Sequence, residues 1–355
     1  MNKPAYKRGP YNKEGKMKAP KNIENPEKEM KRLKAESRKF KRQVKQLEKS
    51  EDLTDKIVGV IKDSVESIPP IKLPKVHVYK DAIGEEVAGL LFSDSHIGKL
   101  TVSYNHKVFA KRLDKLRDSM FSIVEAHRSI RPIKKLVIVF NGDIIDAESI
   151  YPSQSIDGIS AKIIDQIFTV GLPKLTEFLY SCLENFEEVE CCCQRGNHGR
   201  LNASKWSSSK TTNWDTVMYK ALEATTAQQP RIKWHINIKD WKSMFRIQGH
   251  GFLACHGDMI RMYYSLPDYG FSRQSLRWSN AYRSKIKLTH FLFSHFHSIN
   301  TGKRFNDIMY YCNGSFVTDD VFGEEKIGVT SVPEQLLFFV HKKFGVTGRY
   351  PISLT

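Results

Sequence analysis

From residue 88 onward, short apolar runs alternate with longer stretches that mix apolar and polar residues. The stretches 106–128 and 160–185 have helical spacing. This succession of strand, loop and helix predicts an α/β domain. The runs expected to form strands are AGLLFS (88–93), KLVIVFN (135–141), VECCCQ (189–194), FLACH (252–256), THFLFSH (289–295), IMYYCN (308–313) and QLLFFVH (335–341).

A different pattern precedes this domain. Residues 1–26 combine lysines and prolines with few hydrophobics, a composition that cannot offset the entropy of ordering the chain. A second amphipathic stretch ends before Pro69 and Pro70, which stop a helix. We therefore expect a disordered basic arm (1–26), a helical segment with a linker (27–75) and a main domain (76–355). In the helical segment, apolar residues recur at heptad spacing: Met30, Leu33, Phe40, Val44 and Leu47.

This heptad stripe is short, so two interpretations stay open. It predicts either a homodimeric coiled coil through residues 27–49 or a lone amphipathic helix that docks on the main domain.

The charge is strongly positive and unevenly distributed. The 355 residues hold 56 Lys and Arg against 39 Asp and Glu, a net charge of +17, and residues 1–50 hold 17 against 6. Such a field attracts polyanions, such as nucleic acid or an acidic membrane surface, and argues against a binder of basic substrates. The chain has no apolar stretch of membrane-spanning length and no apolar signal segment near its start. We expect a soluble, cytoplasmic protein that does not enter a membrane.

Six cysteines lie mostly inside apolar runs and form no C-x-x-C pair, as expected of buried free thiols. Cys191, Cys192 and Cys193 are consecutive on a predicted strand, where neighbouring side chains face opposite ways. These three therefore cannot converge on one metal.

Residue types that bind metals follow five of the predicted strands. Parallel strands end side by side, so residues that follow them meet at one edge of the sheet. A lone D-x-H or H-x-H is usually a hydrogen-bonded loop pair, but its repetition at five strand ends indicates a metal centre. The five blocks are Asp94-Ser95-His96, Gly142-Asp143, Gly196-Asn197-His198, His256-Gly257-Asp258 and Ser294-His295-Phe296-His297.

In this order the blocks resemble the motifs of the calcineurin-like metallophosphoesterases: D-x-H, G-D, G-N-H, a lone His and G-H-x-H. The resemblance covers roughly residues 86–320. It implies an α/β fold in which a β-sandwich is flanked by α-helices, here preceded by the basic helical arm. It also implies a two-metal centre that hydrolyses phosphoesters.

The resemblance assigns a role to each motif residue. His198 would lie beside the scissile phosphate and donate a hydrogen bond or a proton. The implied metal ligands are Asp94, His96 and His297 for one ion, Asn197, His256 and His295 for the other, and Asp143 as the bridge between them.

The mixture of imidazole, carboxylate and amide ligands suits Mn, Fe or Zn better than Mg or Ca. We favour two Mn²⁺ ions, with Fe or Zn as alternatives. Gly199 stands where an acidic residue often follows G-N-H, and Ser294 stands where Gly usually opens the last block. Asp146 could orient His198 in place of the missing acid, or could simply be an acid at a helix N-terminus.

Two features bear on the substrate. The block G-D-I-I-D-A-E lacks the arginine of the phosphatase motif G-D-x-V-D-R-G, although R-G-N-H at 195–198 does resemble those enzymes. We weigh the absent arginine more heavily, because a phosphomonoester needs bidentate guanidinium contacts. Residues 261–287 interleave cations with aromatic rings, as expected of a surface that follows phosphates and stacks on bases. The expected substrate contacts are Arg200, Arg261, Arg273, Arg277 and Trp278.

Residues 261–287 could instead be a partly buried aromatic loop with a solvated basic rim. Within the family, the opening Ser93-Asp94-Ser95-His96 is most similar to that of the SbcD-type DNA nucleases. Compact relatives with basic arms occur in bacteriophages, which suggests a phage source and hence the host cytoplasm.

The sequence therefore leaves three hypotheses about function. The first is a metal-dependent DNA exonuclease or endonuclease. The second is a phosphoprotein phosphatase or a small-molecule phosphodiesterase. The third is a nucleic-acid-binding structural protein that keeps a metal domain, which the complete set of motif residues disfavours.

Overall fold

The structure is a computed structural model of the whole chain. It describes residues 34, 37–38, 59–60, 62–63, 66, 84–148, 158–201, 212–263, 266–303, 307–319 and 332–355. The chain divides into two compact units, residues 1–63 and 64–355. In the first unit, Lys34, Ser37 and Arg38 are helical and exposed. The apolar positions of the heptad stripe and residues 1–26 lie outside the described residues, so the dimer and the disordered arm stay predictions.

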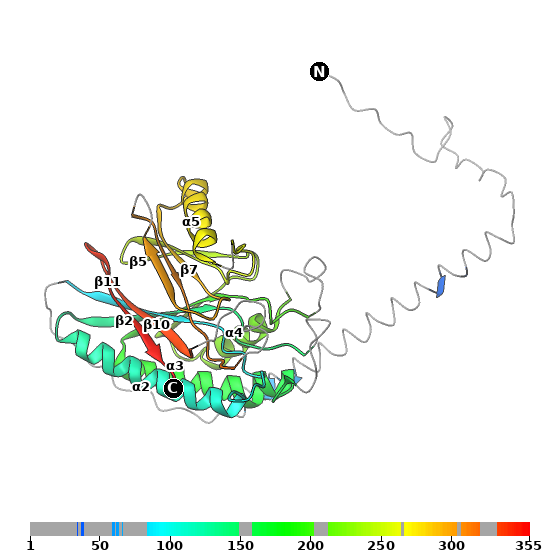
Figure 1. The fold of residues 1–355 in the computed structure, drawn as a ribbon. Coiled ribbons are helices and arrows are strands. Elements are labelled where there is room, and N and C mark those ends of the chain that lie inside the picture. Colours follow the sequence, from blue (N-terminus) through cyan, green and yellow to red (C-terminus); the bar gives the residue numbers. More distant parts are fainter. Residues whose placement is uncertain are drawn as a thin grey trace, which may run out of the picture. The chain divides into compact units, whose positions relative to one another are not determined.

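Six strands of the second unit form one sheet, in the order β11-β10-β1-β2-β3-β4 (Figure 1). β1 to β4 run parallel to one another, and β10 and β11 are added antiparallel at one edge. Strands covered on both faces have no polar face, which explains the unbroken apolar runs of β1 and β2. The strands are β1 (Glu86–Phe92), β2 (Ile133–Asn141), β3 (Glu188–Gln194), β4 (Ile232–Ile236), β10 (Glu334–His341) and β11 (Gly345–Ser353).

Five further strands form a second sheet, in the order β5-β6-β7-β9-β8. Its central strands β6, β7 and β9 are parallel, and β5 and β8 are antiparallel edges. Leu91 and Val139 of the first sheet share one core with Phe252 and Leu292 of the second, so the sheets pack face to face as a sandwich. The strands are β5 (Ser243–Ile247), β6 (His250–Ala254), β7 (Leu288–Phe293), β8 (Asn300–Lys303) and β9 (Met309–Cys312).

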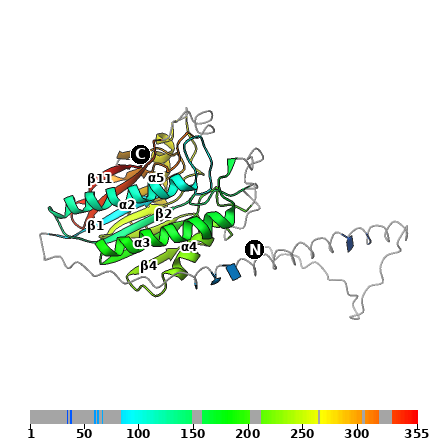
Figure 2. The same ribbon diagram turned by 90° about the horizontal axis from the view of Figure 1, so that it is seen from below.

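Helices cover both outer faces of the sandwich (Figures 1 and 2). The first sheet is covered by α2 (His106–Arg128), α3 (Leu172–Asn185) and α4 (Trp214–Thr225), and the second by α5 (Asp268–Tyr282). Phe178 of α3 lies 6.2 Å from Phe92 of β1, measured between ring centroids. Phe271 of α5 lies 4.9 Å from Phe293 of β7.

α2 shows why the sequence forms these helices. Asn105 caps its first turn, because the side-chain oxygen accepts from the backbone N–H of Lys107 at 2.9 Å and of Val108 at 3.1 Å. One face then carries a buried apolar stripe at helical spacing. The stripe consists of Phe109, Leu113, Leu116, Met120 and Val124.

The structure confirms the predicted α/β sandwich with flanking helices and the seven predicted strands. The stretch 160–185 becomes a π-helical segment, η2 (Asp165–Gly171), followed by α3. The apolar-run criterion missed β4, β5, β8, β11, α4 and α5; β8, for example, reads Asn-Thr-Gly-Lys. All six cysteines are free and buried, as expected. Over the described residues, no helix is long and apolar enough to cross a bilayer.

Candidate metal centre

The five motif blocks meet where two sheets end, rather than at one edge of a single sheet. Three blocks follow β1, β2 and β3, and the other two follow β6 and β7 of the second sheet. Asn141 joins the two sets, because its Nδ2 donates to Cys255 O at 2.9 Å and to Ser294 Oγ at 2.8 Å. Ser294, which replaces the usual Gly, therefore accepts a hydrogen bond between the sheets.

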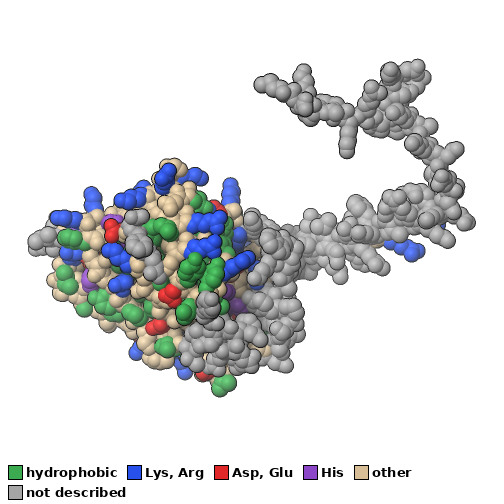
Figure 3. Space-filling view, turned by 45° about the horizontal axis from the view of Figure 1, so that its top comes forward, with side chains coloured by type: hydrophobic (Ala, Val, Ile, Leu, Met, Phe, Trp, Pro, Cys, Tyr) green, Lys and Arg blue, Asp and Glu red, His purple; other side chains and the backbone are tan. Residues whose placement is uncertain are grey.

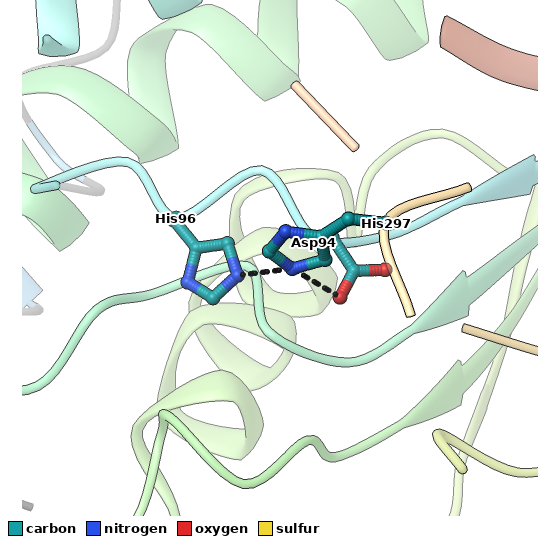
Figure 4. A group of neighbouring side chains, drawn as sticks. All are labelled: Asp94, His96 and His297. Carbon is teal, nitrogen blue, oxygen red and sulfur yellow. Dashed lines mark hydrogen bonds and ion pairs between the residues drawn. The ribbon is translucent and has the colours of Figure 1, made fainter. Parts of the chain in front are cut away.

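The first cluster consists of Asp94, His96 and His297, whose side chains converge in Figure 4. His297 Nε2 lies 3.2 Å from His96 Nε2 and 3.3 Å from Asp94 Oδ1. Burial lowers the pKa of His96, which keeps its ring neutral and leaves a nitrogen lone pair able to bind a metal. Two imidazoles and a carboxylate thus point at a common position.

The second cluster consists of Asp143, His256 and His295. His256 Nδ1 donates to Asn141 O at 2.8 Å, which leaves Nε2 to face Asp143 Oδ2 at 2.9 Å and Asn197 Oδ1 at 3.0 Å. Burial lowers the pKa of His295 to about 3. Burial acts in the same direction on His256, but the charge of Asp143 outweighs it and raises the pKa of His256 to about 10. A metal bound there would displace that proton.

Asp143 belongs to the second cluster and also faces the first. Its Oδ2 is 2.9 Å from His256 Nε2 and 3.9 Å from His96 Nε2. Burial acts to raise the pKa of Asp143, but the charges of His256 and His198 outweigh it and hold the pKa well below its usual value. Asp143 Oδ2 is buried, and the imidazole Nε2 of His256 faces it at 2.9 Å. A buried carboxylate surrounded by imidazole nitrogens is a donor set that fits a divalent cation.

The backbone is strained at these same residues. Eight non-glycine residues of the described ranges have positive φ, a conformation that non-glycine residues rarely adopt. Five of the eight are predicted metal ligands, as expected where strain is retained for function. They are Asp94 (51°), His96 (39°), Asp143 (53°), His295 (76°) and His297 (52°).

His198 lies beside this centre and is held by Asp146. The distance from His198 Nδ1 to Asp146 Oδ1 is 2.5 Å, and His198 N donates to Asp143 Oδ1 at 2.7 Å. Burial acts to lower the pKa of His198, but the charges of Asp143 and Asp146 outweigh it and raise the pKa. Asp146 thus lies where it can orient the His198 ring.

Three residues of the site escaped sequence reasoning: Asn141, Gln166 and Asp215. Gln166, on η2, holds the backbone of Asp146 from both sides: its Oε1 accepts from Asp146 N at 3.0 Å and its Nε2 donates to Asp146 O at 2.8 Å. π-Helical segments are frequent at functional sites, but no sequence pattern distinguishes them from α-helix. Asp215, in the first turn of α4, resembles an ordinary helix-start acid in sequence. Burial and the charge of Asp143 raise its pKa to about 6.

The expected substrate contacts divide into exposed and buried residues. Arg261, Arg273 and Arg277 are exposed, on the loop before α5 and on α5 itself. Trp278 is a correction: it is only 9% exposed and packs in the core against Trp241, 4.9 Å away. Residues 271, 275 and 278 share one face of α5, so the aromatic ring turns toward the sheet and is not free to stack on a base.

Arg200 is also mostly buried, at 9% exposure. Its Nε donates to Asn197 O at 2.7 Å, so its side chain supports the loop that carries Asn197 and His198.

Comparisons with known proteins give a limited picture. No protein-family model matches the chain. The DNA polymerase II small subunit of Pyrococcus abyssi is 27% identical over 189 residues, which are 52% of this chain and 26% of that protein. The match therefore spans about a quarter of the length of that relative.

Similar solved structures share the general fold at low identity. The 5'-nucleotidase of Candida albicans has a TM-score of 0.35 and 11% identity, covering 80% of this chain and 54% of that chain. A Vps29 variant from Entamoeba histolytica has a TM-score of 0.32 and 10% identity, covering 74% and 98%. The phosphoesterase Yfce from E. coli has a TM-score of 0.31 and 12% identity, covering 75% and 100%. Similarities this low carry no argument about the reaction or the substrate.

Proposed function

We propose that the chain is a metal-dependent phosphodiesterase that uses two divalent ions, Mn²⁺ by preference, to hydrolyse DNA. The observation that carries this proposal is the convergence of two Asp/His clusters on Asp143, a buried carboxylate whose Oδ2 lies 2.9 Å from His256 Nε2 and 3.9 Å from His96 Nε2. Asp94, His96 and His297 would hold one ion, and His256, His295 and Asn197 the other. When bound, the ions would supply positive charge to the attacking and leaving oxygens of an in-line displacement.

The chain's own residues supply positioning and a proton. Asp146 fixes the His198 ring through Nδ1, which leaves Nε2 as the nitrogen able to donate to a phosphate oxygen or to the leaving oxygen. Asp143 Oδ1 accepts from His198 N at 2.7 Å, so the residue that faces both clusters also fixes the donor. This link would keep the proton donor in register with the scissile bond.

A nucleic-acid substrate is supported by the surface around α5. Lys and Arg side chains gather beside hydrophobic ones on the face shown in Figure 3. Tyr269 is 57% and Tyr263 37% exposed, with ring centroids 4.7 Å apart, and Arg273 Nη1 donates to the Tyr263 hydroxyl at 2.8 Å. These tyrosines are the rings that bases could reach, in place of Trp278. Similarity to a DNA polymerase subunit over half of the chain agrees with this substrate.

The test is hydrolysis of linear DNA by the full-length chain with Mn²⁺, beside hydrolysis of nitrophenyl phosphate. We expect cleavage of DNA that is lost with a chelator and restored by Mn²⁺. Tyr269→Ala should weaken DNA binding by about 1–3 kcal/mol. Val102→Ala, a change at an exposed position on another loop, is the matched control. Turnover of the phosphomonoester with no cleavage of any DNA would refute the proposal.

One observation favours a phosphomonoesterase as the second candidate. Arg195 precedes Gly196, and its Nη1 is buried with no acceptor in the described part of the chain. A guanidinium beside the centre would suit the extra charge of a monoester. If this candidate is right, Arg195→Lys should reduce turnover of nitrophenyl phosphate far more than that of its bis-ester.

A further inference from the structure

Asp215 is a buried acid that binds the backbone of two site loops at once. Its Oδ2 accepts from Asp143 N at 3.1 Å and from Gly196 N at 2.8 Å. Its Oδ1 accepts from Ile144 N at 3.0 Å and from Ile145 N at 3.1 Å. One carboxylate on α4 therefore receives four backbone N–H groups, from the loop after β2 and the loop after β3.

The usual role of an acid in the first turn of a helix does not account for this arrangement. Such acids interact with the N–H groups of their own helix. Here that role belongs to Asn213, whose Oδ1 accepts from Asp215 N at 2.8 Å. The hydrogen bonds that reach the Asp215 carboxylate from Asp143, Gly196, Ile144 and Ile145 come from outside α4.

The two loops are in close contact where Asp215 holds them. A Cβ on Gly142 would lie 2.4 Å from Gly196 N, and a Cβ on Gly196 would lie 2.0 Å from Asp143 Oδ1. Backbones this close need a common acceptor, because their N–H groups point at the same space. Asp143 also has a φ of 53°, a conformation that its surroundings must impose.

Gly199 completes the arrangement. A Cβ at this position would lie 2.3 Å from Asn213 Oδ1 and 3.1 Å from Asp215 Cγ. The space that a side chain at position 199 would enter is therefore filled by two side chains of the α4 start. The acid that the sequence lacks after Asn197-His198 has a counterpart in space, supplied from another element.

We infer that Asp215 is a positioning residue of the metal centre, which sets the place of Asp143 and of the Asn197 loop by accepting their backbone N–H groups. This inference rests on the proposed function, since it concerns the same pair of ions. Asp146 and Asp215 divide the task of the missing acid: Asp146 orients the His198 ring, and Asp215 fixes the backbone that carries the ligands.

The test measures metal binding by the full-length chain, with no substrate present. Asp215→Asn keeps the shape but places an amide NH₂ against two backbone N–H donors. We expect Mn²⁺ affinity to fall by about 10–100-fold, as for loss of other partners that orient ligands. The paramagnetic resonance signal of a coupled Mn²⁺ pair should give way to that of single ions. Glu86→Gln, a buried carboxylate at the far end of β1, should lower stability but leave Mn²⁺ affinity unchanged.

The possible outcomes separate this inference from the proposed function. A folded Asp215→Asn variant that binds the Mn²⁺ pair as tightly as the wild type overturns the inference alone. A wild-type chain that binds no Mn²⁺ pair overturns the proposed function and the inference together. If Asp215→Asn does not fold, Asp215→Ser is measured by the same criteria, because it leaves room for water to reach the four N–H groups.

Discussion

The amino end of β1 and the carboxyl end of β2 each place an acid in the interior, but only the acid on β1 is fully paired by protein groups. At the amino end, Glu86 accepts from Arg131 Nη1 at 2.6 Å and Thr347 Oγ1 at 2.8 Å, and pairs with His127 Nε2 at 2.6 Å. Burial acts to raise the pKa of Glu86, but these hydrogen bonds outweigh it and lower the pKa. After the carboxyl end of β2, the buried Asp143 Oδ2 faces imidazole nitrogens instead, with His256 Nε2 2.9 Å and His96 Nε2 3.9 Å away.

This difference separates a structural network from a binding site. A buried carboxylate that is fully paired contributes to one folded state and needs nothing further. A buried carboxylate that faces imidazoles, on strained backbone, is a place where a cation can take over the role of the imidazole protons. Substitution of Glu86 should therefore change stability, and substitution of Asp143 should change metal content and turnover.

The largest effect is expected at Asp143. Asp143→Asn removes the charge and one of the two oxygens that face the clusters. Turnover should fall by more than about 100-fold. This loss is larger than the loss expected when a residue that only orients a ligand is removed. Elemental analysis should find both ions depleted. Two tightly held ions in this variant would contradict the assignment of Asp143 as a metal ligand.

Glu86→Gln should have the opposite profile. Loss of one partner from a buried ion pair costs about 3 kcal/mol, because Arg131 loses its counter-charge and His127 Nε2 loses a carboxylate partner. We expect a lower midpoint in urea unfolding, with turnover per folded molecule and metal content unchanged. A metal-depleted Glu86→Gln variant would mean that the Glu86 network and the metal centre are coupled.

His198→Ala sharpens the comparison inside the site. His198 forms a third group of possible ligands with His96 and Asp146, but it belongs to neither the Asp94 cluster nor the Asp143 cluster, so we expect the variant to keep its metal content. Turnover should fall by about 100-fold, as for loss of a general acid. Loss of metal in proportion to activity would make His198 a ligand instead.

Acid should weaken the fold through His290, on β7. Burial lowers the pKa of His290 to about 4, from an ordinary value of 6.5. As pH falls from 6.5 to 4, the unfolded chain takes up a proton that the folded chain refuses, so the free energy of unfolding decreases. His290→Phe should remove about 2–3 kcal/mol of this dependence. Equal pH dependence in both proteins would exclude His290 as its source.

The smallest effect on the chemistry is expected from the N-terminal region. Deleting residues 1–50 removes 17 cations and 6 acids, so the dependence of DNA affinity on salt should become shallower, by nearly one unit of slope for each phosphate that the arm neutralises. Turnover at saturating DNA should hardly change. Sedimentation tests the heptad stripe, because a homodimer through residues 27–49 would become a monomer. An unchanged salt slope would assign the arm to another partner.

Local patterns in the sequence determined the elements and the ligand types. Unbroken apolar runs specify parallel strands buried on both faces, so β1, β2 and β3 could be predicted from composition. The ligand candidates Asp94 and His96 could also be identified, because they follow directly after a predicted strand. α5 could not be predicted in this way, because polar and charged residues separate its apolar ones. Its buried face is determined by the helical spacing of Phe271 and Trp278.

Only the tertiary structure decided which groups share the site. Asp215 is 72 residues from Asp143 in the chain, and the contact between them depends on how α4 packs beside the loop after β2. The meeting of β6 and β7 with β1 depends on stacking of two sheets, which no local pattern encodes. Positive φ at Asp143 or His295 likewise follows from contacts across the site, because the intrinsic preference of a non-glycine residue opposes it.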